Sequence, residues 1–76
     1  MEEDLTHYRA VLAYNVRRLR ELRRVTQRQL AEDIGTPLSQ VWAVEHARQN
    51  IRLDTLVKIA VGLGVDVRTL FDPPSE

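Results

Sequence analysis

The stretch from Gln27 to His46, QRQLAEDIGTPLSQVWAVEH, decides the fold of this chain. It predicts two short helices joined by a tight turn at Gly35, because glycine readily takes the left-handed backbone that ends a helix. Its apolar residues recur at helical spacing and are Leu30, Ala31, Ile34, Val41 and Val44. Ala31 supplies the small side chain needed where the helices touch. This pattern indicates a helix-turn-helix, whose second helix can lie in the major groove of DNA.

Apolar residues at helical spacing also occur on both sides of this stretch. Before it they predict a first helix over about residues 8–24, with Leu12, Val16 and Leu19 facing inward. After it, a loop over residues 47–52 leads to a fourth helix over about residues 53–63, which Gly64 ends. Asp66 can cap a short fifth helix. Because no segment reads as a strand, we predict an all-α fold of five helices around one core.

Capping signals predict the ends of the two central helices. Thr26, followed three residues later by Gln29, forms a capping box. Thr36 and Pro37 suit the cap and the first position of the third helix, since the missing N–H of proline is not needed there. We expect Tyr8 and Tyr14 to complete or cover the core rather than to line a ligand site.

Composition limits the class of protein. The 76 residues make a single domain over residues 1–76. A chain this short buries only ~60% of the surface that it exposes when unfolded, so dimerisation would add stability. The absence of cysteine excludes disulfides and Cys-based metal sites, and His7 and His46 lie too far apart to suggest a metal pair. With no apolar run near ~18 residues and no signal-peptide pattern, we expect a cytoplasmic protein without membrane association.

Charge is unevenly distributed, although the formal net charge is zero. Six arginines and one acid lie between residues 17 and 28, whereas acids gather at both ends of the chain. The local field matters more than total charge for binding a polyanion. A solvated helix face would explain the arginines equally well. The use of ten arginines against one lysine favours phosphate binding somewhat, because the planar guanidinium suits phosphate geometry.

Taken together, these residues resemble the Cro/cI-type phage-repressor domain of the Xre-like family. The resemblance covers about residues 15–71 and rests on NVRRLRELRRVTQRQLAEDIG, on the group of Val41, Val44 and Glu45, and on LDTLVKIAVGLGVDVRTLF. It implies a phage-repressor-like DNA-binding fold with a central helix-turn-helix. The loop QNIRLDTL also resembles that of restriction–modification controller proteins, which are small dimeric transcription regulators.

The resemblance implies roles for three residues. Gln27 matches a glutamine that binds backbone phosphate and braces the recognition helix. Arg20 and Glu45 match a partly buried ion pair that ties the first helix to the end of the third. The sequence pattern agrees, because Glu45 follows the inward-facing valines and therefore needs a cation. We expect this pair to be structural, since breaking a buried pair costs about 3–5 kcal/mol.

The outward face of the third helix is expected to select the DNA sequence. Steps of about 100° from an inward Val41 place Ser39, Ala43 and His46 most outward, with Leu38 and Gln40 at the edges. The candidate base-reading residues are Leu38, Ser39, Gln40, Trp42 and Ala43. The candidate phosphate-binding residues are Gln27, Arg28, His46, Arg48, Asn50 and Arg52. His46 is equally compatible with a plain surface position.

The chain departs from the family pattern in two ways. The third helix has no arginine or lysine, so affinity must come mainly from phosphate contacts elsewhere and fall steeply with salt. Arg24 and Ala47 replace frequent glycines and Ile51 replaces a proline, which puts the loop geometry in question. Trp42 either contacts the DNA backbone or, as we favour, packs over the loop near Ile51 or on the fourth helix.

We therefore predict a sequence-specific DNA-binding transcriptional regulator, a homodimer on a two-fold symmetric operator. Part of an apolar set could form the dimer face, because the set exceeds the needs of one small core; it comprises Val57, Val61, Val65, Val67 and Phe71. The alternative is a protein-interaction module on the same scaffold, an antitoxin or adaptor with weak or no DNA binding. An enzyme is disfavoured because no nucleophile–base set or phosphate-binding glycine loop is found, and we expect no cofactor or small-molecule ligand.

Overall fold

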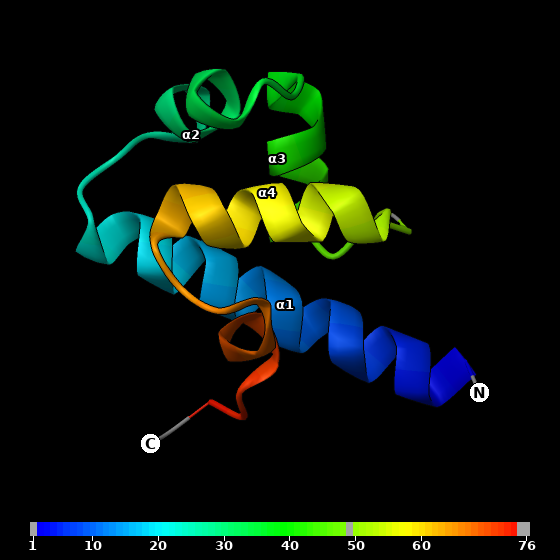
Figure 1. The fold of residues 1–76 in the computed structure, drawn as a ribbon. Coiled ribbons are helices and arrows are strands. Elements are labelled where there is room, and N and C mark those ends of the chain that lie inside the picture. Colours follow the sequence, from blue (N-terminus) through cyan, green and yellow to red (C-terminus); the bar gives the residue numbers. More distant parts are fainter. Residues whose placement is uncertain (1, 49, 75–76) are drawn as a thin grey trace.

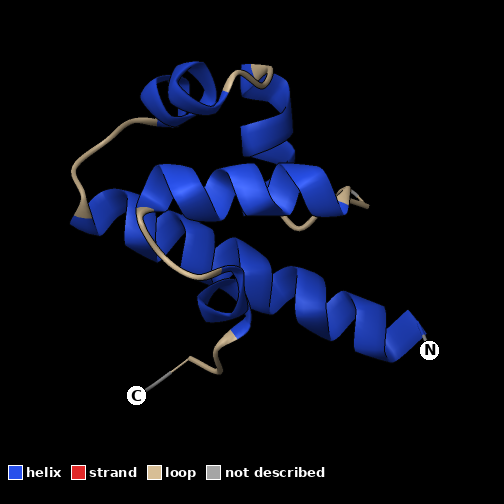
Figure 2. Ribbon diagram, in the orientation of Figure 1, coloured by secondary structure: helices blue, strands red, loops and turns tan. Residues whose placement is uncertain are grey.

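The computed structural model describes residues 2–48 and 50–74, and this part of the chain is helical without strands. The elements are α1 (Glu2–Leu22), α2 (Gln27–Ile34), α3 (Leu38–Glu45), α4 (Leu53–Leu63) and the 3-10 helix η1 (Val67–Phe71). Figure 1 shows α2 and α3 at one end of the molecule, α4 across the middle, and α1 with η1 on the opposite side. The predicted all-α fold is confirmed (Figure 2). The count of five α-helices is not, because the fifth element is a short 3-10 helix.

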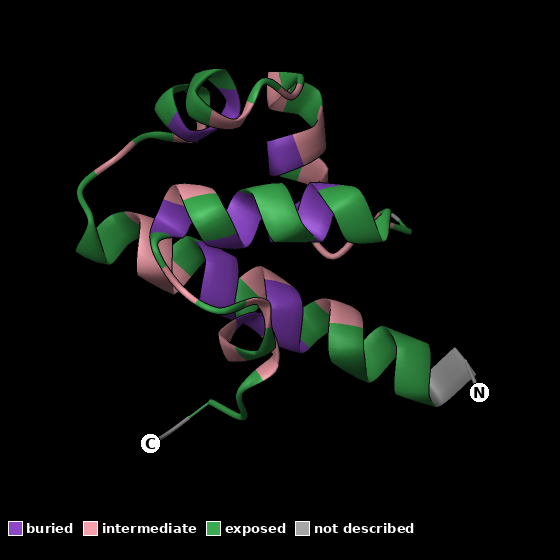
Figure 3. Ribbon diagram, viewed as in Figure 1, coloured by how far each residue is buried: buried purple, intermediate pink, exposed green. Residues whose placement is uncertain are grey.

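All five elements contribute side chains to one core, which lies between α1, α4 and the α2–α3 pair (Figure 3). The buried apolar residues that pack together in this core are Leu12, Val16, Leu30, Ala31, Val41, Val44, Leu56, Ile59, Ala60, Leu63 and Leu70. Gly62 allows α4 to approach α2, because a Cβ there would lie 2.6 Å from Cγ2 of Ile34. The core therefore fixes α2 and α3 as a unit on α4.

One buried amide fastens η1 to α1. Asn15 is 1% exposed, and its Nδ2 donates to the carbonyl oxygens of Leu70 and Asp72, each at 2.9 Å. Because buried polar groups are costly unless they are hydrogen-bonded, the two contacts specify where η1 docks.

Among the described residues, no helix is long and apolar enough to cross a membrane.

The ends of α2 follow the predicted signals. The hydroxyl of Thr26 accepts from the backbone N–H of Gln29 at 3.0 Å, and the side chain of Gln29 accepts from the backbone N–H of Thr26 at 2.8 Å. The capping box is therefore present. Gly35 follows α2 with φ of 68°, in the left-handed region that ends the helix.

The predicted start of α3 was wrong by one residue. Pro37, not Thr36, is the residue that precedes the helix, and α3 begins at Leu38. Thr36 makes no side-chain cap because its hydroxyl donates to Oε1 of Gln40 at 3.0 Å. The threonine thus orients a residue on the third helix instead of capping that helix.

The first helix differs from its prediction at both ends. It begins at Glu2, well before residue 8, and Asp4 in its first turn suits the positive end of the helix dipole. It ends at Leu22, before residue 24, since Arg24 takes a left-handed conformation. Of the two alternatives expected for Tyr8 and Tyr14, they do not complete the core, because they are 53% and 45% exposed, and covering it is the one that their exposure allows.

Two turns hold non-glycine residues in a left-handed backbone. Arg24, between α1 and α2, has φ of 58°, and Ala47, just after α3, has φ of 56°. These are the two positions at which the resemblance to the Xre-like family implies glycine. The backbone geometry is thus retained without glycine, at the steric cost of placing a Cβ close to a carbonyl oxygen.

We predict that Ala47→Gly stabilises the fold by about 0.5–1 kcal/mol, because glycine removes the strain of positive φ. Ala10→Gly is the matched control: Ala10 is exposed within α1, where the same change should cost about 0.5–1 kcal/mol. Urea unfolding followed by circular dichroism measures both. A loss of stability in both variants would show that position 47 carries no strain.

Candidate nucleic-acid interface

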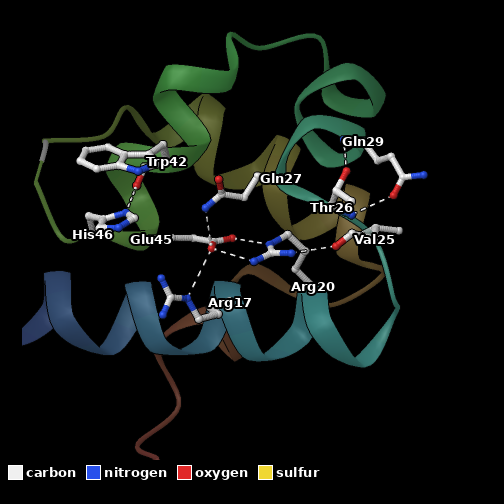
Figure 4. Close-up of polar contacts among 9 residues, drawn as sticks. All are labelled: Arg17, Arg20, Val25, Thr26, Gln27, Gln29, Trp42, Glu45 and His46. Carbon is white, nitrogen blue, oxygen red and sulfur yellow. Dashed lines mark hydrogen bonds and ion pairs between the residues drawn. The ribbon is translucent and has the colours of Figure 1, made fainter.

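The carboxylate of Glu45 is the centre of a polar cluster between α1, α2 and α3 (Figure 4). Its side chain is 0% exposed. Arg20 from α1 donates from Nε to Oε2 at 2.6 Å and from Nη2 to Oε1 at 3.0 Å. Gln27 from α2 donates from Nε2 to Oε1 at 3.0 Å. One carboxylate at the end of α3 is therefore bound by side chains from both neighbouring helices.

Arg20 also contacts the turn that leads into α2. Its Nη1 donates to the carbonyl oxygen of Val25 at 2.8 Å, so the guanidinium joins α1, this turn and α3. Arg17 lies farther from Glu45, with Nε 3.6 Å from Oε1, and its side chain is 49% exposed. The bidentate geometry of Arg20 is the stronger contact, because two parallel bonds fix both distance and orientation.

The electrostatics of the cluster keep Glu45 ionised. Burial alone raises the pKa of Glu45, since it removes water from the charged form. The hydrogen bonds from Arg20 and Gln27, together with the charges of Arg20 and Arg17, outweigh this effect, so the pKa of Glu45 lies below its ordinary value. A charged carboxylate that accepts three hydrogen bonds suits a structural role.

The side chain of Gln27 can bond Glu45 and a second acceptor at the same time. Its Nε2 donates to Glu45, while the residue itself is the first of α2 and is half-buried. An amide nitrogen has two N–H groups, so one can bond Glu45 while the other remains available for an oxygen acceptor. The same side chain can therefore support α3 and bind phosphate.

The five predicted base-reading residues on α3 lie in three different environments. Ser39 and Trp42 are exposed, whereas Gln40 and Ala43 are half-buried. Leu38 is half-buried and packs against the core, so only part of its side chain is available for a thymine methyl. Gln40 accepts from Thr36, and this contact holds its amide at the start of the helix.

Trp42 and His46 form a stacked aromatic pair, visible in Figure 4. Their ring centroids are 3.9 Å apart with an interplanar angle of 17°, and Trp42 remains 44% exposed. His46 is held through its Nδ1, which lies 2.8 Å from the carbonyl oxygen of Trp42. The indole therefore presents a large exposed surface beside α3.

The predicted phosphate-binding residues lie at both ends of the helix-turn-helix. Arg28 is exposed in the first turn of α2, and Arg48, Asn50 and Arg52 are exposed in the segment between α3 and α4. Arg52 forms an exposed ion pair with Asp54 at 3.2 Å. Such surface pairs contribute little to stability, so the arginine can exchange this partner for a phosphate.

Sequence reasoning missed two residues near these sites. Arg17 was noted only as one of several arginines, yet it faces Glu45; its position three residues before Arg20 on one helix was the available signal. Arg9 was not considered at all, and its guanidinium donates to Oδ1 of Asn50. No local pattern in the sequence relates Arg9 to a residue 41 positions away.

Comparisons with known proteins agree with this arrangement. The helix-turn-helix family model matches residues 16–70. A hypothetical transcription factor of Neisseria meningitidis is 44% identical over 75 residues, which cover 99% of this chain and 68% of that protein. The crystal structure of a hypothetical transcription factor from Neisseria matches with a TM-score of 0.85 at 43% identity, covering 88% of this chain and 77% of that one.

The restriction–modification controller protein C.AhdI from Aeromonas hydrophila also matches. Its crystal structure gives a TM-score of 0.80 at 30% identity and covers 83% of this chain and 96% of that one. The predicted resemblance to the Xre-like family and to controller proteins is therefore confirmed.

We predict that Arg20→Met destabilises the fold by about 3–5 kcal/mol, because Glu45 would then be a buried charge without its main partner. Arg52→Met is the matched control: the arginine side chain of that pair is 82% exposed, so its loss should change stability by less than about 1 kcal/mol. Chemical unfolding of both variants measures the difference. Similar small losses in the two variants would show that the Glu45 cluster does not stabilise the fold.

Proposed function

Because the chain belongs to the helix-turn-helix family, we propose that it is a sequence-specific DNA-binding transcriptional regulator acting in the cytoplasm as a homodimer. Its relatives support this proposal, since they include a hypothetical transcription factor and a restriction–modification controller protein. The role is binding rather than catalysis.

The observation that carries the proposal is that one side of α3 is bound to the rest of the domain while the other side is exposed to solvent. The inner side is held by Val41, Val44 and the bonds to Glu45. The outer side exposes Ser39 and Trp42. A helix that is rigidly held with polar and aromatic side chains turned outward suits insertion into the major groove.

Base selection and affinity are assigned to different residues. On α3, Gln40 suits adenine, because the hydroxyl of Thr36 uses one lone pair of Oε1 and leaves the second lone pair and the Nε2 donors for the base edge. Arg28, Arg48 and Arg52 surround the helix and suit phosphate. Since α3 has no cation, most of the electrostatic attraction comes from outside it.

The dimer face that we propose lies on α4 and the end of α2. Val57 and Val61 are 44% and 73% exposed, and with Ile34 they line a shallow hollow whose edge includes Asp33 and Lys58. A two-fold axis through this hollow can bring Asp33 of one copy opposite Lys58 of the other, twice, and cover the valines. The other residues of the predicted apolar set, Val65, Val67 and Phe71, are half-buried against the core.

Selection of bound sequences from a random duplex pool, followed by gel shifts on the selected duplex, tests the function. We expect enrichment of a two-fold symmetric sequence and tight binding that falls steeply with salt. Absence of binding even at low salt would refute the proposal. It would favour the protein-interaction module, for which the exposed Trp42 would be the first surface to test.

We predict that Arg48→Ala weakens binding to all duplexes and reduces the slope of log K against log salt by about 0.9, because one phosphate contact is lost. Gln40→Ala should instead change the preferred base at one position of each half-site, by about 1–3 kcal/mol of discrimination. Arg68→Ala is the control, since Arg68 is an exposed arginine on η1, at the opposite end from α2 and α3 (Figure 1). Unchanged binding in both test variants would show that α3 and the following loop do not face DNA.

We predict that Val61→Asp converts a dimer into a monomer of 8.8 kDa, because two buried carboxylates would face each other across the two-fold axis. Light scattering after gel filtration measures the mass. Leu5→Asp is the control. Leu5 is 45% exposed near the start of α1, outside the proposed dimer face, so this substitution should leave the mass unchanged. A dimer that survives Val61→Asp would place the interface elsewhere.

A further inference from the structure

The first half of α1 contacts the loop between α3 and α4, although it precedes the matched family range of residues 16–70. Arg9 donates from Nη2 to Oδ1 of Asn50. Beside it, the ring of Tyr8 meets that of Phe71 edge-on, with centroids 6.4 Å apart. The extension of α1, meaning its residues before position 16, is thus packed against the domain at the side where the loop leaves α3.

Arg9 is held there mainly by packing. It is half-buried and lines a hollow of about 200 Å³ with Leu5, Tyr8, Leu12, Ile51 and Phe71. Its Nε is fully buried and has no hydrogen-bond partner among the described residues. Packing in this hollow restricts the conformation of the guanidinium, so its bond to Asn50 has a defined direction.

This direction determines what Asn50 presents to solvent. An amide has an acceptor oxygen and a donor nitrogen on opposite sides of one planar group. With Oδ1 bonded to Arg9, the N–H groups of Nδ2 remain for another acceptor, and Asn50 is exposed between the exposed Arg48 and Arg52. A neutral N–H donor flanked by two cations suits a phosphate oxygen.

We propose that Arg9 is a positioning residue for DNA binding: it fixes the amide of Asn50 so that Nδ2 donates to a backbone phosphate. Arg9 itself does not contact the DNA. The inference rests on the proposed function and assigns to the extension of α1 the task of orienting a phosphate contact on a loop outside it.

A double-mutant cycle on the selected duplex tests this proposal. Arg9→Met keeps the apolar stem and removes the donors, Asn50→Ala removes the amide, and the double variant removes both. We expect each single variant to weaken binding about tenfold, as for one hydrogen bond to a charged group, and the double variant to lose no more than either. Arg9→Lys, which restores a donor, should recover most of the affinity.

Two further measurements separate positioning from other roles. The slope of log K against log salt should be unchanged in Arg9→Met, whereas a direct phosphate contact by Arg9 would lower it by about 0.9. Asn50→Asp should retain the contact with Arg9 and the thermal stability, yet bind DNA at least as weakly as Asn50→Ala. Circular dichroism melting of every variant confirms that it is folded.

Additive losses in the cycle, a lowered salt slope, or wild-type binding by Arg9→Met would each overturn this inference while leaving DNA binding intact. A wild-type protein that binds no duplex would overturn the proposed function and this inference together. The two failures are therefore distinguishable from one set of titrations.

Discussion

The buried carboxylate of Glu45 sets the position of α3, and the other features of the site depend on that position. The hydrophobic contacts of Val41 and Val44 give α3 a side to bury, but apolar contacts are non-directional and allow a helix to rotate or slide. Bidentate bonds from Arg20 and a third bond from Gln27 remove that freedom. They act on the last residue of α3, so the orientation of the whole short helix is specified from one end.

Burying this ion pair has a thermodynamic cost as well as a geometric benefit. The desolvation of two charges offsets much of their attraction, so the pair adds little net stability. A position of α3 that separated the two charges would nevertheless be strongly disfavoured, because it would leave Glu45 buried without its partner. α3 has 8 residues and few internal hydrogen bonds, so contacts with the neighbouring helices must hold it in position. The cluster therefore serves mainly to orient α3, as the proposed insertion of this helix into a groove of DNA would require.

The sequence predicted those features that depend on neighbouring residues. The capping box of Thr26 and Gln29, the left-handed Gly35 and the all-helical fold follow from local backbone chemistry, and the structure confirms them. The conformation of the η1 segment did not follow, since α and 3-10 turns share the same cap and apolar spacing. The one-residue error at the start of α3 came from Thr36, whose hydroxyl had two possible partners and bonds Gln40.

The features that the sequence could not predict are those in which a side chain has several possible partners, near or far along the chain. The stacking of Trp42 on His46 is compatible with an i, i+4 spacing, yet neither expectation for Trp42 included it, because exposed aromatic rings have several surfaces on which to pack. For the predicted base-reading and phosphate-binding residues, the sequence gives residue types, while the structure gives their exposure and partners. Their contacts with DNA stay predictions.

In the function that we propose, the distribution of cations divides the binding of phosphates from the recognition of bases. α3 contains no basic residue, whereas arginines are exposed on the segments around it, at Arg28, Arg48 and Arg52. Phosphate contacts from a rigid frame carry no sequence information, so they can be strong without favouring one base. Contacts made by neutral side chains on α3 are individually weaker, and they discriminate only if the frame fixes the helix in the groove to within a fraction of a hydrogen-bond length. If α3 reads bases as we propose, a helix without cations must be held rigidly, and the bonds of Arg20 from α1 and Gln27 from α2 to Glu45 hold it.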